Sequence, residues 1–368
     1  MRTLRINLDA IVHNLDVMRA RASQAKVMGV VKANAYGHGA VEVAKTLEQA
    51  GVDYLGVADI GEALALREAG ISAPILAWLH DPSDDFVAAL SKNVDLGVAN
   101  LEQLSRISKA AAITGQVAKL HLKIDTGLGR NGSTAADWTK LLEAVKELGE
   151  SVQVVGIFSH LSTTSRTDDL DQIEKFDQAV DEAKRVGVKF ELRHLTASDG
   201  SLAYPDAHYE MVRIGVALYG LDPFSTNRGA EYGLAPAMTA VSRVSQIKRV
   251  PAGHGVSYNY LHRTKSETNL ALVPVGYAEG LPRAATGKAE VLIGGKRYPI
   301  LSQIAMDQFV LDIGDDPISV GDEVIIFGDA QTGAPSADDL AAAAGTINYE
   351  IVTRMGGRFQ REYLGVRQ

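Results

Sequence analysis

The feature that most constrains the fold is a regular alternation of short apolar runs with helical segments through the first part of the chain. The runs are rich in β-branched residues, and they are KVMGVV, DYLGVA, PILAWL, DLGVA, AKLHLKI, VQVVGIF, KFELRHL and VRIGVALYG. Segments such as GEALALREAG and DQIEKFDQAVDEAKRVG lie between them, with apolar residues at helical spacing. Runs that are apolar throughout are typical of strands buried on both faces of a parallel sheet.

Eight such runs within about 220 residues predict a closed, TIM-like (β/α)8 barrel. A helix over LDAIVHNLDVMRARA is expected before the first strand. An open doubly wound sheet is the alternative, and it is disfavoured because no G-x-G-x-x-G follows any of the runs. We therefore expect a barrel domain over residues 1–229.

The pattern changes around DPFSTNRGAEYGLAP, a segment rich in Pro, Gly and Asn. Strand-like runs then follow one another with little helix: MTAVSRVSQIKRV, NLALVPVGY, AEVLIGGKRYPI, QFVLDIG and DEVIIFG. One short helix, SADDLAAAAG, interrupts them before INYEIVTRM. This order predicts a second, mainly antiparallel β domain over residues 230–368.

Composition limits the classes of partner and chemistry. The net charge of −8 argues against nucleic acid or an anionic membrane surface as the main partner. The chain has no cysteine, so it has no disulfide, thiolate metal site or cysteine nucleophile, and we expect no metal. The opening MRTLRINLDA lacks the apolar core of a signal peptide, and no run approaches the length of a membrane span. A cytoplasmic location is the expectation.

The stretch VVKANAYGHG places Lys32 where a buried strand becomes a polar loop. Catalytic groups of a barrel lie at the C-terminal ends of its strands, so Lys32 is expected at that rim. A lysine beside an apolar strand has a lowered pKa and can act as an amine nucleophile or base. Its position alone is equally compatible with a lysine that only extends to solvent.

Polar side chains follow other predicted strands at the same rim. They are Lys123, Asp125 and Arg130 after the fifth run, His160 after the sixth, His194 and Ser198 after the seventh, and Arg213 and Gly215 in the eighth. A barrel commonly binds phosphate with the loops after strands seven and eight, so Ser198 and the amides around Gly215 are candidates. A reactive lysine facing a phosphate site suggests pyridoxal phosphate held as a Schiff base. Each residue alone also fits a structural role, and only their convergence indicates a site.

These motifs resemble those of the alanine racemases, a family of pyridoxal-phosphate enzymes with an N-terminal barrel and a C-terminal β domain. VVKANAYGHG resembles the family's cofactor-lysine motif, and HLKIDTGLGR, VSYNY, VGYAEG, AMDQ and GTINYE match further blocks in the expected order. The resemblance covers nearly the whole chain. It implies an enzyme that interconverts L-alanine and D-alanine and supplies D-alanine for cell-wall peptidoglycan.

The resemblance also implies the residues that hold pyridoxal 5'-phosphate. Lys32 forms the Schiff base, and Arg213 faces the pyridine nitrogen. The residues that match phosphate-binding positions are Tyr36, Ser198, Gly215, Val216 and Tyr349.

Other matching positions contact the substrate or the second subunit. Arg130 matches the arginine near the cofactor hydroxyl and the substrate carboxylate, and Met306 matches the position whose backbone amide binds that carboxylate. Tyr258 resembles the base on the face of the α-carbon opposite Lys32, supplied by the partner subunit. The resemblance therefore implies a homodimer with shared active sites.

Racemisation explains why two bases are needed. Inversion requires an acid or base on each face of a planar intermediate, since one base returning the proton to its own face only exchanges it. Lysine and tyrosine both have reference pKa values of about 10, so both must be lowered to work near neutrality. For Tyr258 we expect a chain through His160 to Arg213, because nearby positive charge favours the phenolate. Arg213 stays protonated, so the pyridine nitrogen should stay neutral.

Lys123 and Arg130 place two cations on one short segment. Lys123 matches a lysine that the family often carries as a carbamate, which would replace repulsion with a charge-assisted bond to Arg130. The alternative is that Asp125 or another acid balances the charge and Lys123 stays cationic.

Three residues depart from the family pattern. Ala197 stands where asparagine is common, Gln303 where arginine is common, and Ser165 where an acidic partner of that arginine is often found. Losing the last two together suggests a lost ion pair in the substrate channel, with Arg283 and Tyr277 still lining it.

Rival functions remain to be weighed. A single-domain barrel that binds pyridoxal phosphate without turnover would lack the β domain that carries Tyr258. A decarboxylase of related architecture would pair an acid with the pyridine nitrogen and use a cysteine, which this chain lacks. A racemase of wider substrate range stays open, because the size of the pocket cannot be derived from the sequence.

Overall fold

The computed structural model describes residues 2–22 and 24–365, which form two compact units. The barrel unit comprises Leu15–Ala35 and Ala40–Gly215. The sheet unit comprises the described residues up to Asn14, together with Tyr36–Gly39 and the described residues from Val216 onward. Each unit has its own sheets, and each is described by itself.

The barrel unit is built on one sheet of eight parallel strands in the order β8-β7-β6-β5-β4-β3-β2-β9. The strands are β2 (Lys26–Val30), β3 (Tyr54–Val57), β4 (Ile75–Ala77), β5 (Asp95–Val98), β6 (Ala118–Lys123), β7 (Val152–Phe158), β8 (Leu192–His194) and β9 (Met211–Ile214). A backbone hydrogen bond of 3.0 Å from Arg213 N–H to the carbonyl of Thr196, two residues beyond β8, links the two ends of the sheet. The predicted (β/α)8 barrel is confirmed.

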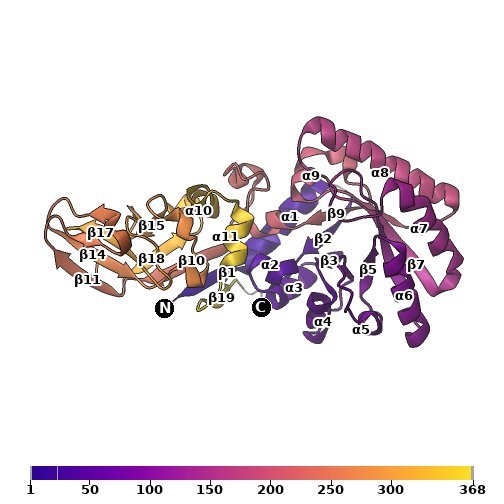
Figure 1. Cartoon of the computed structure of the whole chain (residues 1–368), viewed down its shortest axis with the longest axis horizontal. Helices are drawn as coiled ribbons and strands as arrows, with labels where there is room; N and C mark the ends of the chain where they lie inside the picture. The colour runs from indigo at the N-terminus through magenta and orange to yellow at the C-terminus, as the bar shows by residue number, and fades with distance from the viewer. Residues whose placement is uncertain (1, 23, 366–368) are drawn as a thin grey trace. The chain divides into compact units, whose positions relative to one another are not determined.

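Helices follow the strands and lie outside the sheet (Figure 1). They are α3 (Ala40–Gln49), α4 (Ile60–Glu68), α5 (Phe86–Ser91), α6 (Leu101–Thr114), α7 (Ala135–Glu147), α8 (Arg166–Val186) and α9 (Ser198–Ala203). The strands are buried on both faces because helices cover the outside and side chains fill the inside, which is why their sequences are apolar throughout. The interior cluster includes Met28, Leu76 and Met211, with Trp78 packed against it.

The sheet unit contains three sheets. The largest has the strand order β16-β15-β18-β10-β1-β19, the second β11-β14-β17, and the third β12-β13. The strands are β1 (Thr3–Asn7), β10 (Met238–Arg243), β11 (Gln246–Val250), β12 (Gly255–Val256), β13 (His262–Arg263), β14 (Thr268–Val273), β15 (Glu290–Ile293), β16 (Lys296–Pro299), β17 (Phe309–Gly314), β18 (Glu323–Phe327) and β19 (Gln360–Leu364). All pairs are antiparallel except β1 with β19, so the mainly antiparallel character that the sequence predicts is confirmed.

Two predicted helices are present, and one helix and two strands were not predicted. The predicted opening helix is α1 (Leu8–Ala22), and SADDLAAAAG forms α10 (Ala337–Ala344). INYEIVTRM, to which we assigned no helix, forms α11 (Asn348–Arg354) and buries Ile351 and Val352. Strands β1 and β19 were not predicted; in the largest sheet β1 pairs with β10 on one side and with β19 on the other. The division at residues 229 and 230 stays a prediction.

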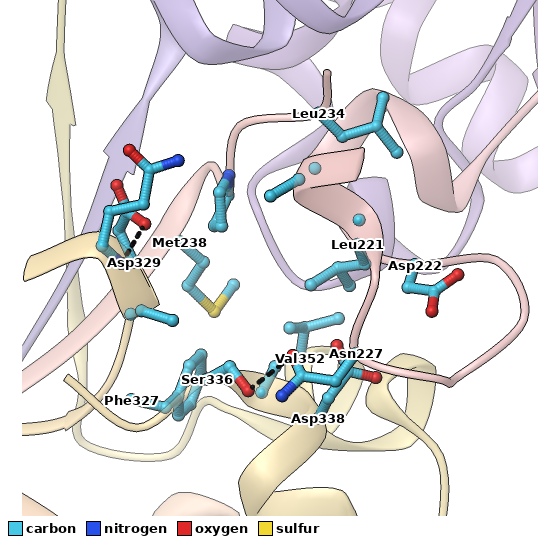
Figure 2. Close-up of a pocket in the computed structure, with 18 residues that line it drawn as sticks. Leu221, Asp222, Asn227, Leu234, Met238, Phe327, Asp329, Ser336, Asp338 and Val352 are labelled. Atoms are coloured by element: carbon cyan, nitrogen blue, oxygen red, sulfur yellow. Dashed lines mark hydrogen bonds between the residues drawn. The ribbon is translucent and has the colours of Figure 1, made fainter. Parts of the chain in front are cut away.

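The sheet unit contains a cavity of about 100 Å³ between the segment after Gly220 and the start of α10 (Figure 2). Leu221, Met238 and Phe327 form its apolar wall, and Asp329 and Ser336 line its polar side. No site residue expected from the sequence lines this cavity. Within residues 2–22 and 24–365, no helix is both long and apolar enough to cross a membrane.

Candidate active site

The turn that carries Lys32 has an unusual backbone. It follows β2 as α2 (Lys32–Tyr36), in which Ala33, Asn34 and Ala35 have φ of 51°, 54° and 53°. These are left-handed values, and they cost a residue other than glycine roughly 1–2 kcal/mol each. Such strain persists only where the surroundings hold it, and it concentrates at functional sites.

Three hydrogen bonds hold this turn in the barrel unit. Ala35 N–H donates to the carbonyl of Val31 at 2.8 Å, and Ala40 N–H donates to the side-chain oxygen of Asn34 at 2.8 Å. Ala33 N–H donates to Oε1 of Glu62 at 2.6 Å. The other carboxylate oxygen of Glu62 accepts from Ala58 N–H at 2.8 Å, so one side chain ties the Lys32 turn to the end of β3.

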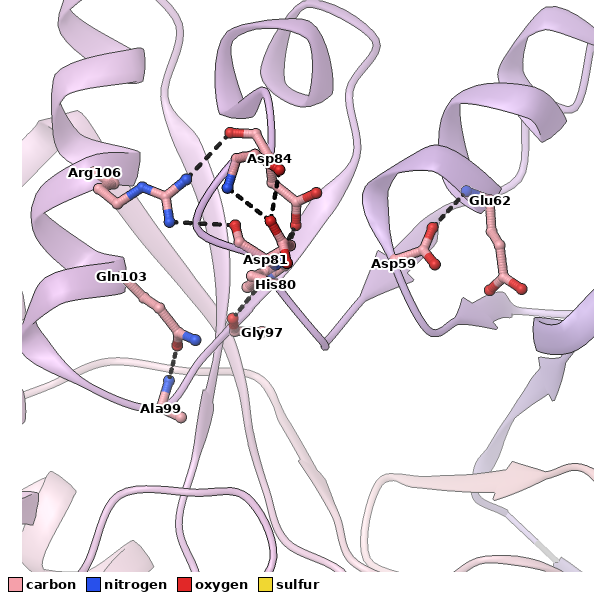
Figure 3. A network of polar contacts seen from close by, with 10 residues as sticks. Asp59, Glu62, His80, Asp81, Asp84, Gly97, Ala99, Gln103 and Arg106 are labelled. Atoms are coloured by element: carbon pink, nitrogen blue, oxygen red, sulfur yellow. Dashed lines mark hydrogen bonds and ion pairs between the residues drawn. The ribbon is translucent and has the colours of Figure 1, made fainter.

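The loops after β3, β4 and β5 are fixed by similar polar contacts (Figure 3). Asp59 caps α4 by accepting from Glu62 N–H at 2.8 Å, which positions the Glu62 side chain one turn into the helix. Further along the rim, the His80 ring contacts the carbonyl of Gly97 at 2.8 Å, and Arg106 donates to the carbonyls of the loop after β4. Hydrogen bonds between neighbouring loops therefore hold this rim of the barrel in place.

The electrostatic surroundings of Lys32 favour the neutral amine. Burial lowers its pKa most, and the positive charge of Arg130 lowers it further. The carboxylate of Glu62 acts in the opposite direction, and Arg213 adds a smaller lowering. A lysine with a lowered pKa has a larger neutral fraction near pH 7, and only the neutral amine is a nucleophile or a base.

Arg213 is the most heavily bonded cation of the site. Its guanidinium donates from Nη1 to the carbonyl of His194 at 2.8 Å, and from Nη2 to the carbonyls of Ser159 and Leu195, each at 2.8 Å. It also lies 3.1 Å from Nδ1 of His194 and 3.1 Å from Nδ1 of His160. Among the described residues, no acceptor is found for its Nε–H.

These contacts fix the protons of two histidines. Because a guanidinium only donates, Nδ1 of His160 and Nδ1 of His194 must both accept, and each neutral ring carries its proton on Nε2. Burial is the largest cause that lowers the pKa of both rings well below the ordinary value. The positive charge of Arg213 lowers both further, and the neighbouring His121 lowers that of His194. The predicted link from His160 to Arg213 is present.

Lys123 is a buried amine with no carboxylate at ion-pair distance among the described residues. Its side chain is 7% exposed, and its Nζ lies 5.3 Å from the centre of the Phe158 ring. Burial, followed by Arg213 and Arg130, lowers its pKa to about 8. Asp125 is the acid considered as its counter-charge. Its Oδ1 accepts hydrogen bonds from the backbone N–H groups of Gly127 and Gly129, at 2.9 and 3.2 Å.

The expected phosphate residues of the barrel unit contact each other. Gly215 N–H donates to Oγ of Ser198 at 3.0 Å, so the ends of β9 and the start of α9 lie together. Ala197, the departure from the family pattern, precedes α9 and provides no side-chain cap. In this unit the structure thus brings together Lys32, Lys123, Arg130, His160, Ser198, Arg213 and Gly215.

The remaining phosphate positions belong to the sheet unit. The ring of Tyr36 lies 6.2 Å from that of Tyr349 and 4.9 Å from that of Tyr219. Val216 is buried and begins the 3-10 turn Val216–Tyr219. Gly37 has φ of +83°, and a Cβ there would lie 2.3 Å from the carbonyl oxygen of Val352, so only glycine fits beside α11.

The expected catalytic base and the expected substrate residues of the sheet unit have exposed side chains. Tyr258 is 67% exposed, Met306 54% and Tyr277 41%, which leaves all three free to meet a ligand or another chain. Tyr277 N–H donates to the carbonyl of Ala305 at 3.1 Å, and so the Tyr277 turn and the Met306 loop are joined.

The departures at positions 303 and 165 have local partners. The amide group of Gln303 lies between the side-chain nitrogen of Asn259 at 2.9 Å and Nε of Arg283 at 3.1 Å. Ser165 caps α8, exchanging hydrogen bonds with Asp168 at 2.6 and 3.1 Å. Neither residue carries a charge, so an ion pair between these two positions is ruled out by their chemistry.

Sequence reasoning missed Glu62, which holds the Lys32 turn. The signal was available, because Asp59 and Glu62 have the spacing of a helix N-cap and its third residue directly after the run DYLGVA. This spacing placed the carboxylate of Glu62 near the carboxyl end of a barrel strand, beside the expected lysine. His121 and Asp95 were also missed, since nothing in the sequence distinguishes a polar residue inside a barrel from one at its surface.

Comparison with known proteins gives a consistent result over the whole chain. The family described as "Alanine racemase, N-terminal domain" matches residues 6–223, and "Alanine racemase, C-terminal domain" matches residues 237–363. The chain is 46% identical to the alanine racemase of Frankia casuarinae, over 98% of this chain and 95% of that protein. It is 44% identical to the alanine racemase of Mycobacterium tuberculosis, over 97% of this chain and 94% of that protein.

Solved structures are similar to the same extent. The alanine racemase from the D-cycloserine-producing Streptomyces lavendulae superposes with a TM-score of 0.96 at 44% identity, covering 99% of this chain and 97% of that one. The alanine racemase of Streptomyces coelicolor A3(2) gives a TM-score of 0.96 at 40% identity, covering 99% and 98%.

Proposed function

The chain belongs to the alanine racemase family, and we propose that it interconverts L-alanine and D-alanine with pyridoxal 5'-phosphate and two bases. Lys32 is the base on one face of the substrate α-carbon. Tyr258 of the partner subunit is the base on the other. The family resemblance also supports a role in supplying D-alanine for peptidoglycan in the cytoplasm, and the division into domains 1–229 and 230–368.

The single observation that carries the proposal is the unused donor of Arg213. Protein acceptors take the donors on both Nη atoms, while Nε–H has no acceptor among the residues described. A donor-only group fits an acceptor, and an unprotonated pyridine nitrogen is such an acceptor. Lys32, with its lowered pKa, fits an aldehyde that needs a neutral amine.

The phosphate would be held by small and hydroxyl-bearing residues. Ser198 supplies a hydroxyl, and its Oγ accepts from Gly215 N–H at 3.0 Å, so that amide positions the serine. Gly215 itself is assigned to the phosphate on the family match. Tyr36, Val216 and Tyr349 are proposed to complete this set, on the strength of the family match. A dianionic phosphate suits backbone N–H and hydroxyl donors, because each donor stabilises charge without adding a counter-ion.

Bound pyridoxal phosphate would delocalise the electron pair left when the α-proton departs. The chain's own residues do the remaining work. Lys32 and Tyr258 of the partner subunit move the proton on opposite faces. His160, neutral and protonated on Nε2, can donate toward that tyrosine, while its Nδ1 is held by Arg213 at 3.1 Å. Arg213 keeps the ring nitrogen unprotonated, because it has no proton that it can give up near neutral pH.

The substrate carboxylate is assigned to Arg130, the backbone amide of Met306 and the Tyr277 side of the channel. We propose that Lys123 is carbamylated and orients Arg130. Support comes from the family match and from the state of the amine, whose pKa near 8 leaves a sizeable neutral fraction able to add carbon dioxide. Gln303 and Ser165 then leave the channel without an ion pair at those positions.

The test is complementation between two inactive variants. If each site uses Lys32 of one chain and Tyr258 of the other, both Lys32→Ala and Tyr258→Ala are nearly inactive as homodimers. In a mixed dimer one site takes both defects and the other takes neither. Equal random mixing makes half the dimers mixed, so activity should recover to about a quarter of wild type.

Differently tagged chains confirm that mixed dimers have formed. If tagged mixed dimers form and stay inactive, Tyr258 does not serve the partner's site. Borohydride reduction of the wild-type holoenzyme provides an independent check, because peptide mapping should find the pyridoxyl label on Lys32. A label on Lys123 would contradict the assignment.

A further inference from the structure

A chain of polar side chains crosses the interior of the barrel below Arg213. His194 Nδ1 lies 3.1 Å from Nη1 of Arg213, and His194 Nε2 lies 2.9 Å from Nδ1 of His121. His121 Nε2 faces Oδ2 of Asp95 at 3.6 Å, and the Tyr54 hydroxyl donates to the same oxygen at 2.7 Å. The chain therefore runs from the candidate site to a buried carboxylate.

This chain connects opposite ends of the barrel. His194 is the last residue of β8, at the rim that carries Lys32, whereas Asp95 and Tyr54 are the first residues of β5 and β3. His121 lies between these levels, on β6. His194 and His121 are fully buried and Asp95 is 3% exposed, so all three side chains lie in the interior of the barrel, away from bulk solvent.

The surrounding barrel is shaped around the two imidazoles. His194 stacks on Phe158 with ring centres 4.8 Å apart and planes 5° apart, and Tyr54 packs edge-on to His121 at 5.8 Å. Gly156 makes room, because a Cβ at that position would lie 2.9 Å from Nδ1 of His121. Apolar side chains would fill this interior at a lower cost in folding free energy, because a buried polar group without a partner costs about 1–3 kcal/mol.

The Arg213 end of the chain fixes the position of the proton on each imidazole. Arg213 can only donate, so His194 accepts on Nδ1 and carries its proton on Nε2. That proton points to His121 Nδ1, which must accept, and so His121 carries its own proton on Nε2, toward Asp95. The carboxylate of Asp95 accepts a hydrogen bond from Tyr54 at 2.7 Å. His121 Nε2 lies 3.6 Å from the same oxygen, too far for a hydrogen bond, and has no hydrogen-bond partner among the described residues, so this last link is electrostatic.

We propose that His121 and Asp95 are positioning residues that act through His194 to hold the guanidinium of Arg213 in the orientation that leaves its Nε–H for the cofactor ring. The inference rests on the proposed function for the role of Arg213, and on the hydrogen-bond geometry for the proton order. If the order reversed at any link, His194 would present N–H to Arg213, two donors would face each other, and the guanidinium would have to turn.

The proton order is tested without mutation, cofactor or activity. The apoprotein is labelled with [¹⁵N]histidine, and the ring nitrogens of His121 and His194 are assigned with the single variants His121→Gln and His194→Gln. In both rings Nε2 should carry the proton and Nδ1 should carry none, as in the Nε2–H tautomer. A protonated Nδ1, or a cationic ring, on either residue overturns the chain. Absence of alanine racemisation by the wild-type holoenzyme would instead refute the proposed function.

The positioning role is tested by a double-mutant cycle between Asp95→Leu and Arg213→Lys. If Asp95 acts through Arg213, Asp95→Leu should lower kcat about tenfold in the wild-type background and less than about twofold in the Arg213→Lys background. A role in packing alone predicts the same loss in both backgrounds, and that outcome overturns the proposal.

Three further variants keep the test decisive if Asp95→Leu folds poorly. The amide of Gln carries an acceptor and a donor, so His121→Gln can pass the same order of hydrogen bonds, whereas His121→Leu cannot. We expect His121→Gln to recover at least about half of the activity that His121→Leu loses. Tyr54→Phe, which removes the hydrogen bond to Asp95 but leaves the two histidines and the carboxylate in place, is the matched control and should cost less than about threefold. Equal losses in all three variants would contradict the positioning role.

Discussion

Replacing Lys123 by methionine should stabilise the apoprotein near neutral pH. Methionine keeps most of the side-chain length and removes the amine from its site between Arg213, Arg130 and the Phe158 ring. The lysine is 7% exposed, so solvent screens its charge very little. The ammonium form is therefore the unfavourable state of this side chain in the folded barrel.

The magnitude follows from the pKa, which burial and the two arginines lower from 10.5 to about 8. Below pH 8 the folded protein must hold a proton that it binds less tightly than the unfolded chain does. At about 1.4 kcal/mol per pH unit, the cost is roughly 3 kcal/mol. Between about pH 8 and 10.5 the unfolded chain binds more protons, so wild-type stability rises across that window.

The assay is urea unfolding followed by tryptophan fluorescence. The chain has 2 tryptophans, Trp78 and Trp138, and both belong to the barrel unit, so the signal reports that unit alone. In buffers free of carbon dioxide, Lys123→Met should be about 2–3 kcal/mol more stable than wild type at pH 6–7, and this gain should shrink toward zero near pH 10. Adding bicarbonate should stabilise wild type only, if the amine becomes a carbamate.

Lys119→Met on the same strand is the matched control. Lys119 is half-buried and lies 3.4 Å from the side chain of Asn93, outside the candidate site. Its replacement should change stability by less than about 0.5 kcal/mol at either pH. A gain for Lys123→Met that is the same at pH 6 and pH 10, or no gain at either, would refute the assignment of a destabilising buried ammonium.

Three further predictions concern the two bases, the Lys32 turn and the sheet unit. Tyr258→Phe should slow racemisation by about 10²–10⁴-fold while Lys32 still exchanges the α-proton of one enantiomer with solvent, measured by NMR in D₂O, and loss of exchange for both enantiomers would contradict two-base catalysis. Glu62→Ala should weaken cofactor binding by about tenfold in a fluorescence titration, and Glu62→Gln by less, because an amide oxygen still accepts a hydrogen bond. Gly37→Ala should destabilise the sheet unit by at least about 1–3 kcal/mol in calorimetry, because its φ is +83° and its Cβ would meet Val352; an unchanged transition would show that the backbone relaxes there.

The strands of the barrel were predictable because their burial is uniform. Residues Tyr54–Val57, Asp95–Val98 and Met211–Ile214 are buried at every position, and this removes the polar alternation that would otherwise obscure a strand. The same rule explains the order of elements, since parallel strands need a crossover and a helix is the usual one.

The helix over INYEIVTRM was not predicted, because its local sequence and its tertiary packing favour different structures. Its β-branched residues favour a strand locally, but Ile351 and Val352 gain more by packing as one face of α11. Strands β1 and β19 were missed because they are short and lie at opposite ends of the chain, and their pairing exists only when the ends meet. Propensity within a window contains no information on that pairing.

The residues of the candidate site divide into those that the sequence indicates and one that it does not. Lys32, Arg213, His160 and Ser198 follow from motifs, because each lies at the carboxyl end of a barrel strand. Glu62 needed the structure, since its role depends on a left-handed turn that alanine and asparagine do not adopt by preference.

The sequence by itself determined the alternation of strands and helices, the rim that bears the charged residues, and the motifs that match the family. These are properties of chain order and residue type. Only the tertiary structure decided the proton order from Arg213 through His194 and His121 to Asp95, and the lowered pKa of Lys123. Hydrogen-bond direction and desolvation depend on which groups face each other after folding, and residues from four different strands meet there only because the sheet closes.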